Sequence, residues 1–123
     1  KKLVPAPVKR DAKEKTRYGV IYFGSTSVAM DEALAALESQ GLHLDTLRLR
    51  AFPFSDEVVE FINAHDQVFL IEQNRDGQVR TLIVNELGID PVGNSAAAFR
   101  EFLGAEVAKW AKVIRDANVK VEN

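Results

Sequence analysis

The side chains best suited to binding chemistry stand in one short run. Glu72, Gln73 and Asn74 follow the apolar stretch 68–71, which is typical of a fully buried strand. Residues 75–77 then turn the chain into a helix that begins near Gln78. In open α/β sheets the carboxyl ends of parallel strands open onto a crevice where ligands bind, so these four side chains predict a binding or interface site. The alternative is that they only satisfy loop backbone and cap the next helix.

Hydroxyl and guanidinium groups add two further candidates. Ser25, Thr26 and Ser27 follow Gly24 at the predicted start of a helix, where backbone N–H groups can bind an anion, although an N-cap explains them equally well. Arg48 and Arg50 share one face of a predicted strand. Two guanidinium groups there favour carboxylates, a phosphate or a partner subunit as ligand. The alternative is a pair of exposed arginines on an edge strand.

Other catalytic chemistry finds little support. His43 and His65 stand in no Ser/His/Asp pattern and no metal-ligand cluster. His65 lies at a predicted helix end beside Asp66, which is typical of a surface histidine stabilised by the helix dipole. The sequence has no cysteine, which excludes disulfides, thiolate catalysis, and iron–sulfur or zinc sites built on thiolates. An independent enzyme is therefore the least favoured class.

The composition is that of an ordinary globular domain. The 123 residues suffice for one sizeable core, and 46% are hydrophobic against 28% charged. No apolar run approaches the length of a membrane span and no signal-peptide pattern opens the chain, so a cytoplasmic protein with no membrane partner is expected. The first residue is not methionine, which suggests a trimmed or excised chain.

The formal net charge of −2 is unevenly distributed. Residues 1–17 carry seven Lys or Arg against two Asp or Glu, a charge of +5 that leaves −7 for residues 18–123. A basic segment can contact nucleic acid, but this one has no aromatic residue for base stacking and an acidic body follows it. We therefore expect a solvated linker and no nucleic-acid partner. Pro5 and Pro7 exclude a helix over residues 3–8 and leave an edge strand or a linker.

Three strand–helix units are expected to position the polar side chains. Strands are predicted at 18–23, 42–52 and 68–71, with helices starting near Ser25, Ser55 and Gln78. The alternation in 42–52 changes phase near Thr46, which indicates a bulge or the true start of the strand. Repeated strand–helix units predict a three-layer α/β/α domain with a mostly parallel sheet.

The same topology predicts which loops meet. Right-handed crossovers bring the loops after all three strands to one edge, so residues 25–27 and 72–74 should stand near each other. An unpaired carboxylate after a buried run is costly. We therefore expect Arg48 or Arg50 to be the counter-charge of Glu72.

At these segments the chain resembles a known family. Gly24-Ser25-Thr26, the stretch 47–54 (Leu-Arg-Leu-Arg-Ala-Phe-Pro-Phe) and the stretch 72–78 (Glu-Gln-Asn-Arg-Asp-Gly-Gln) are similar to the α subunit of 2-oxoacid:ferredoxin oxidoreductases of the 2-oxoglutarate type. The similar region is the C-terminal domain of that subunit and covers residues 3–91. It implies a transketolase C-terminal-like fold over residues 18–91, after a basic linker or edge segment over residues 1–17.

The resemblance also implies a function. In that family the whole enzyme uses thiamine diphosphate to decarboxylate a 2-oxoacid, forms the acyl-CoA and passes electrons to ferredoxin. Thiamine diphosphate, Mg and the iron–sulfur cluster are expected elsewhere in the enzyme, with no cofactor in this chain. The implied role is a non-catalytic scaffold and subunit-contact domain, whose partners are the rest of the α subunit and the β subunit. The alternatives are an anion or small-molecule binding module and a self-associating α/β domain that forms a homo-oligomer.

Beyond Pro91 the similarity ends. The family continues with a further strand and a Tyr-Asp-Gly-like loop, whereas residues 92–123 predict one amphipathic helix with Ser95 as N-cap. This tail resembles the C-terminal end of the periplasmic solute receptors of tripartite tricarboxylate transporters. The sequence therefore suggests two joined segments that resemble different families. The helix's apolar face needs cover from the domain's own sheet or a second chain, which makes Trp110 a candidate core or oligomer-interface residue.

Overall fold

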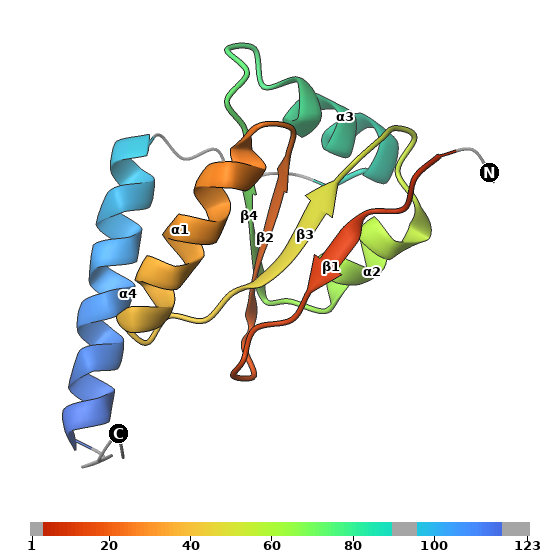
Figure 1. The fold of residues 1–123 in the computed structure, drawn as a ribbon. Coiled ribbons are helices and arrows are strands. Elements are labelled where there is room, and N and C mark those ends of the chain that lie inside the picture. Colours follow the sequence, from red (N-terminus) through yellow and green to blue (C-terminus); the bar gives the residue numbers. More distant parts are fainter. Residues whose placement is uncertain (1–3, 90–95, 117–123) are drawn as a thin grey trace.

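The computed structural model describes residues 4–89 and 96–116. The elements, in chain order, are β1 (Val8–Arg10), β2 (Tyr18–Phe23), α1 (Thr26–Ser39), β3 (Asp45–Leu49), α2 (Asp56–Asn63), β4 (Gln67–Ile71), α3 (Gln78–Leu87) and α4 (Ala96–Asp116). They form one sheet in the order β1-β3-β2-β4, in which β3, β2 and β4 are parallel and β1 is antiparallel to β3 (Figure 1). The predicted α/β class with a mostly parallel sheet is confirmed.

The sheet lies between two helical layers. Successive side chains of a strand point to opposite faces, so β2 sends Ile21 to one layer and Val20 to the other. Ile21 belongs to a core cluster with residues of β3 and α2, against which Val79 of α3 also packs. Val20 packs with Met30 of α1 in a second cluster. On that second side lies α4, next to α1 (Figure 1). The arrangement is thus three-layered, as predicted.

The strand β4 is the outer strand of the sheet and is only half-buried. The side chains of residues 68–71 are all partly exposed, whereas Ile21 in the neighbouring β2 is 1% exposed. No other strand in the described part of the chain pairs with the free edge of β4. The prediction of a fully buried strand was wrong, because its apolar run reflects two covered faces and not a central position in the sheet.

The strand β3 and the helix after it differ in detail from the prediction. The strand β3 begins at Asp45. The change in the alternation of apolar and polar residues near Thr46 therefore marks the start of the strand and not a bulge. Ser55 occupies the N-cap position of α2, but its hydroxyl lies 3.2 Å from Glu57 Oε2 and makes no capping bond. Gly41 and Gly88 both have positive φ, at 81° and 63°, and lie just after the ends of α1 and α3.

Residues 8–17, the N-terminal arm, are joined to the sheet. Val8–Arg10 forms an edge strand on β3, and it begins directly after Pro7, whereas residues 5–7 themselves are not in a strand. The arm's cations form 3.0 Å ion pairs with acidic groups: Lys9–Asp11, Arg10–Asp31, Lys13–Glu38 and Arg17–Asp66. Exposed pairs of this kind contribute only about 0–1 kcal/mol each, so backbone pairing and buried bonds must do more to hold the arm.

The helix α4 is attached to the sheet by β2 and β4. The ring of Phe102 lies 5.6 Å from that of Phe69 in β4, and the Tyr18 hydroxyl donates to Glu106 Oε2 at 2.9 Å. The predicted long helix is therefore present and packs on its own domain. Ser95 and the side chain of Trp110 lie outside the described residues, so their predicted roles stay predictions. Among described residues, no helix has the length and apolar character that a membrane span requires.

Candidate functional site

The carboxyl ends of the three parallel strands lie level at one edge of the sheet. Tyr22 of β2 stands opposite Arg48 of β3 on one side and Ile71 of β4 on the other. The loops after these strands therefore begin at the same edge, which is the upper edge in Figure 1. Because β2 and β4 are neighbours, the segments after Phe23 and after Ile71 leave adjacent strands.

Glu72 closes the start of α3. Its Oε1 accepts a hydrogen bond from Val79 N at 2.9 Å, and its Oε2 accepts one from Arg80 N at 3.1 Å. The carboxylate thus satisfies two N–H groups of the first helical turn and lies at the positive end of the helix dipole. Gly77 precedes the helix with φ 58°, a left-handed conformation that glycine adopts without strain.

The predicted pairing of Glu72 with Arg48 or Arg50 is wrong. The strand β2 separates β3 from β4, so these groups start about 10 Å apart across the sheet. Backbone N–H groups supply the countercharge instead. For Glu72, the helix-capping alternative is the correct one.

The rest of this loop is largely exposed. The side-chain Nδ2 of Asn74 donates a long hydrogen bond to Glu72 Oε1 at 3.4 Å. Arg75 forms an ion pair with Asp76 at 2.8 Å. Gln73 and Gln78 are exposed, and neither side chain forms a hydrogen bond within the described part of the chain. These two amides are available to a partner.

At the start of α1 the three hydroxyl residues differ. Ser25 is exposed at the N-cap position with helical backbone, and its side chain makes no capping bond. Thr26, the first residue of α1, is 5% exposed, while Ser27 is half-buried. Capping therefore does not account for Ser25.

Arg48 and Arg50 are both exposed. In the described ranges, 4–89 and 96–116, neither guanidinium group has an ion-pair partner. Arg48 stands opposite Val8 of β1, so it lies on an inner strand that the short β1 covers, and not on the edge itself. Both remain free for an anionic ligand or a partner surface.

A buried polar cluster that the sequence did not reveal lies at the opposite edge. The His65 side chain is 3% exposed, and its Nε2 lies 2.9 Å from Asp45 Oδ2. Its Nδ1 lies 2.7 Å from the carbonyl oxygen of Phe61. The other Asp45 oxygen accepts a 2.7 Å bond from the backbone N–H of Ala12 in the arm. The expectation of a surface histidine was wrong.

Gly19 explains how the histidine is buried. A Cβ at this position of β2 would lie 2.8 Å from the Phe61 ring and 3.2 Å from the His65 ring. The two rings pack against each other with centroids 4.4 Å apart and planes tilted by 44°, in the space that the missing side chain leaves. A glycine inside an otherwise apolar strand is the sequence signal that could have indicated this close approach.

A second set of bonds joins the arm to the segment before β3. The Thr16 hydroxyl donates to the carbonyl of His43 at 2.7 Å and accepts a 3.1 Å bond from Tyr18 N. His43 Nδ1 is buried and has no hydrogen-bond partner in the described structure. No group of three or more His, Asp or Glu side chains that could hold a metal ion occurs among the described residues.

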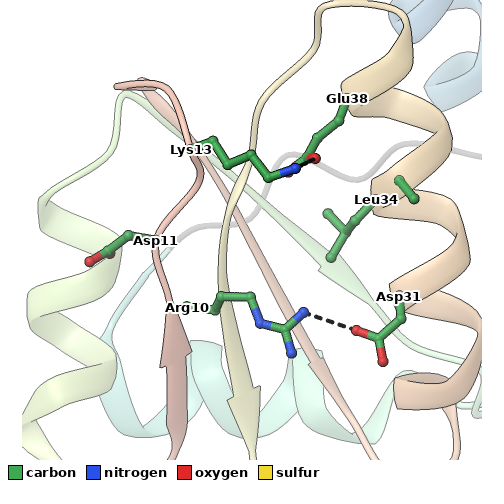
Figure 2. Close-up of a pocket in the computed structure, with 7 residues that line it drawn as sticks. Arg10, Asp11, Lys13, Asp31, Leu34 and Glu38 are labelled. Atoms are coloured by element: carbon green, nitrogen blue, oxygen red, sulfur yellow. Dashed lines mark hydrogen bonds and ion pairs between the residues drawn. The ribbon is translucent and has the colours of Figure 1, made fainter.

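The surface hollows lie away from the predicted crevice. An open hollow of about 430 Å³ separates the arm from α1 and is lined by Arg10, Asp11, Lys13, Asp31, Leu34, Ala35 and Glu38 (Figure 2). Figure 2 shows that its cations already face acidic partners, Arg10 toward Asp31 and Lys13 toward Glu38. This hollow is better explained as the seam between arm and helix than as a ligand site.

Comparison with known proteins identifies a similar fold. No family model matches the sequence, and no curated protein matches it. The structure is similar to 2-oxoglutarate:ferredoxin oxidoreductase from Magnetococcus marinus, solved with 2-oxoglutarate, coenzyme A and succinyl-CoA bound, with a TM-score of 0.63 and 22% identity over 74% of this chain. The match spans only 16% of that much longer chain.

A weaker match is the α chain of a probable 2-oxoacid ferredoxin oxidoreductase from Thermoplasma acidophilum, with a TM-score of 0.44 and 22% identity. It covers 72% of this chain and 78% of that one. At these identities the likeness concerns the fold alone.

Proposed function

We propose that this chain is a scaffold and subunit-contact domain of a cytoplasmic, thiamine diphosphate-dependent 2-oxoacid:ferredoxin oxidoreductase. Residues 18–91 would correspond to the transketolase C-terminal-like domain of a 2-oxoglutarate-type α subunit. The observation that carries the proposal is the fold similarity to one domain-sized part of the Magnetococcus marinus enzyme. The segments 24–26, 47–54 and 72–78 support the same assignment from sequence.

The residues of this chain do not fit the cofactors of such an enzyme. The sequence has no cysteine to hold an iron–sulfur cluster, and the described residues offer no cluster of three metal-binding side chains. We therefore place thiamine diphosphate, its metal ion and the cluster in other domains or subunits. The isolated chain should show no 2-oxoacid oxidation.

The carboxyl edge of the sheet is the surface best suited to a partner subunit. It combines the free amides of Gln73 and Gln78 with the unpaired Arg50. Two large apolar side chains are exposed on segments that start at the same edge, Val28 at 82% and Phe52 at 47%. Aromatic and arginine side chains among polar groups are typical of subunit interfaces.

A double variant tests this role. Gln73→Ala with Asn74→Ala removes two exposed amides whose one side-chain bond among the described residues is the long, exposed 3.4 Å contact of Asn74 with Glu72, so urea unfolding of the domain should change little. In the whole enzyme, capture of the β subunit and reduction of ferredoxin with 2-oxoglutarate and coenzyme A should both weaken. The matched control is Ser39→Ala with Gln40→Ala, two exposed polar residues at the far end of α1. A large loss of stability with normal assembly would show that these side chains serve the fold.

An anion-binding module is the second candidate. The uncapped Ser25 and the unpaired Arg48 and Arg50 favour it, since all three lie at or near the carboxyl edge. The isolated chain can be titrated with inorganic phosphate while the NMR shifts of the backbone amides of residues 25–27 are monitored. This titration distinguishes an anion-binding module from a contact domain. Saturable shifts that Arg50→Ala abolishes would favour this module over the contact domain.

A further inference from the structure

We propose that Asp45 and His65 form a proton-dependent clasp that fastens the N-terminal arm to the sheet. The clasp is closed while the imidazole ring carries both protons and opens when one of them is lost. Three parts of the chain meet there: β3 through Asp45, the end of α2 through His65, and the arm through Ala12.

Hydrogen-bond chemistry fixes the closed form. The two groups opposite the His65 ring nitrogens are the Phe61 carbonyl and the Asp45 carboxylate, and both are acceptors only. Each short contact therefore needs a proton on the ring side. Only the imidazolium has both N–H groups, so these two distances fit a ring that carries both protons and faces the Asp45 carboxylate.

A neutral ring cannot keep both contacts. If Nδ1 keeps its proton, the Nε2 lone pair faces the Asp45 oxygen at 2.9 Å; if Nε2 keeps it, the Nδ1 lone pair faces the Phe61 carbonyl at 2.7 Å. The ring is 3% exposed, so water does not readily replace the missing proton. One of the two contacts must open.

The arm is coupled to this event through a single carboxylate. One Asp45 oxygen holds the ring and the other accepts the Ala12 N–H at 2.7 Å, so turning the carboxylate away from the ring disturbs both bonds. The arm's ion pairs Arg10–Asp31 and Lys13–Glu38 are exposed and hold it weakly. Loss of the clasp should therefore loosen the arm around Ala12, between the β1–β3 pairing and the Thr16 bond to the His43 carbonyl, without unfolding the domain.

The charged and titratable neighbours do not replace the clasp. Lys9 on β1 interacts chiefly with Asp11, which raises the pKa of its ammonium group, and more weakly with Asp45. Asp66, the residue after His65, is turned to solvent and pairs with Arg17 at 3.0 Å. His43, just before β3, has a buried Nδ1 for which the described residues supply no hydrogen-bond partner.

The test compares ring protonation with arm protection in the same molecule. In the ¹⁵N-labelled chain, ring ¹⁵N shifts of His65 report its protons, and amide exchange corrected for the intrinsic rate reports the arm, from about pH 5 to about pH 9. We expect both ring nitrogens to be protonated at the acidic end. As the ring loses a proton, exchange of Ala12 should accelerate about tenfold or more, while core amides such as Ile21 keep their protection.

Two variants separate the clasp from its surroundings. Asp45→Asn keeps an acceptor for Ala12 but removes the charge, so exchange of the arm should no longer follow the ring. Asp66→Asn removes the neighbouring exposed carboxylate and should leave the coupling intact. The proposal is overturned if the His65 ring is neutral at every pH at which the protein is folded. It is also overturned if the exchange rate of the Ala12 amide does not change with ring protonation. This holds in the unmodified protein even if Asp45→Asn fails to fold.

Discussion

Glu72 Oε1 and the backbone nitrogen of Val79 lie 2.9 Å apart, which joins the end of β4 to the first turn of α3. The two residues are seven positions apart in the sequence, and a second bond from Arg80 N reaches the other carboxylate oxygen. The five residues between β4 and Gly77 are thus closed into a loop in which the Gln73 side chain is exposed. A helix-capping acid fixes the shape of the edge that we propose as a contact surface.

Removal of this cap should destabilise the domain measurably. For Glu72→Ala we expect a loss of about 1–2 kcal/mol in the free energy of unfolding, because two N–H groups of the first helical turn lose a charged acceptor. Glu72→Gln should cost less, since its amide oxygen can still accept one bond. Urea unfolding measures both. Gln73→Ala, one residue away and exposed, is the control and should change stability by less than about 0.5 kcal/mol; equal losses for the two positions would contradict the capping role.

Gly19 gives a steric test of the core beneath the clasp. A Cβ there would stand 2.8 Å and 2.9 Å from two atoms of the Phe61 ring, so Gly19→Ala should cost about 1–3 kcal/mol as the ring and its helix shift. Gly104→Ala in α4 is the matched control. A Cβ at that position meets nothing within 4 Å, and a helical alanine should add about 0.5–1 kcal/mol of stability. Thermal melting of the two variants should therefore move in opposite directions.

How much of this structure follows from the sequence depends on the range of the interactions. The bounds of β2, the start of α3 and the glycines that end two helices follow from local patterns, because periodicity and left-handed residues act over a few positions. The edge position of β4 does not, since strand order is set by pairing between distant segments. Hydropathy is the same for an outer strand with both faces covered and for a central one.

Local sequence patterns do not predict the polar contacts between distant segments. Asp45 and His65 are twenty residues apart and meet only because β3 and the end of α2 reach the same edge. Glu72 was assigned a guanidinium partner on grounds of charge, while the structure gives it backbone donors that carry no sequence signature. The candidate loops after β2, β3 and β4 were correctly placed at one edge because these three strands run parallel, as repeated strand–helix units predict.

Tyr18 provides a prediction on pH dependence. The pKa of this phenol is raised above the usual value near 10. Burial is the larger cause, and the hydrogen bond to Glu106 is the next. A raised acid pKa means that the folded state holds the proton more tightly. Its stabilising contribution is therefore complete below the usual value and is lost as the pH rises toward the folded-state pKa.

Phenolate absorbance of the folded chain should show a titration above that of free tyrosine, and Tyr18→Phe should remove it. Loss of the bond to Glu106 should also lower stability by about 1 kcal/mol at neutral pH. If the late titration persists in Tyr18→Phe, it belongs to the other tyrosine, Tyr22, and the assignment is wrong.

Trp110 decides whether the last helix belongs to the domain core or to an oligomer. The described part of α4 already packs on the sheet through Phe102 and Glu106, and position 110 follows Glu106 by one helical turn. If the indole continues that contact, Trp110→Ala should cost about 3–5 kcal/mol in the free energy of unfolding. If it packs between two chains, the monomer should keep its melting temperature and sedimentation should show that the oligomer is lost. Lys112→Ala, an exposed residue two positions on, is the control for general effects on the helix. Unchanged melting together with unchanged sedimentation would mean that the indole covers neither surface, and that the helix is held to the domain by its first turns alone.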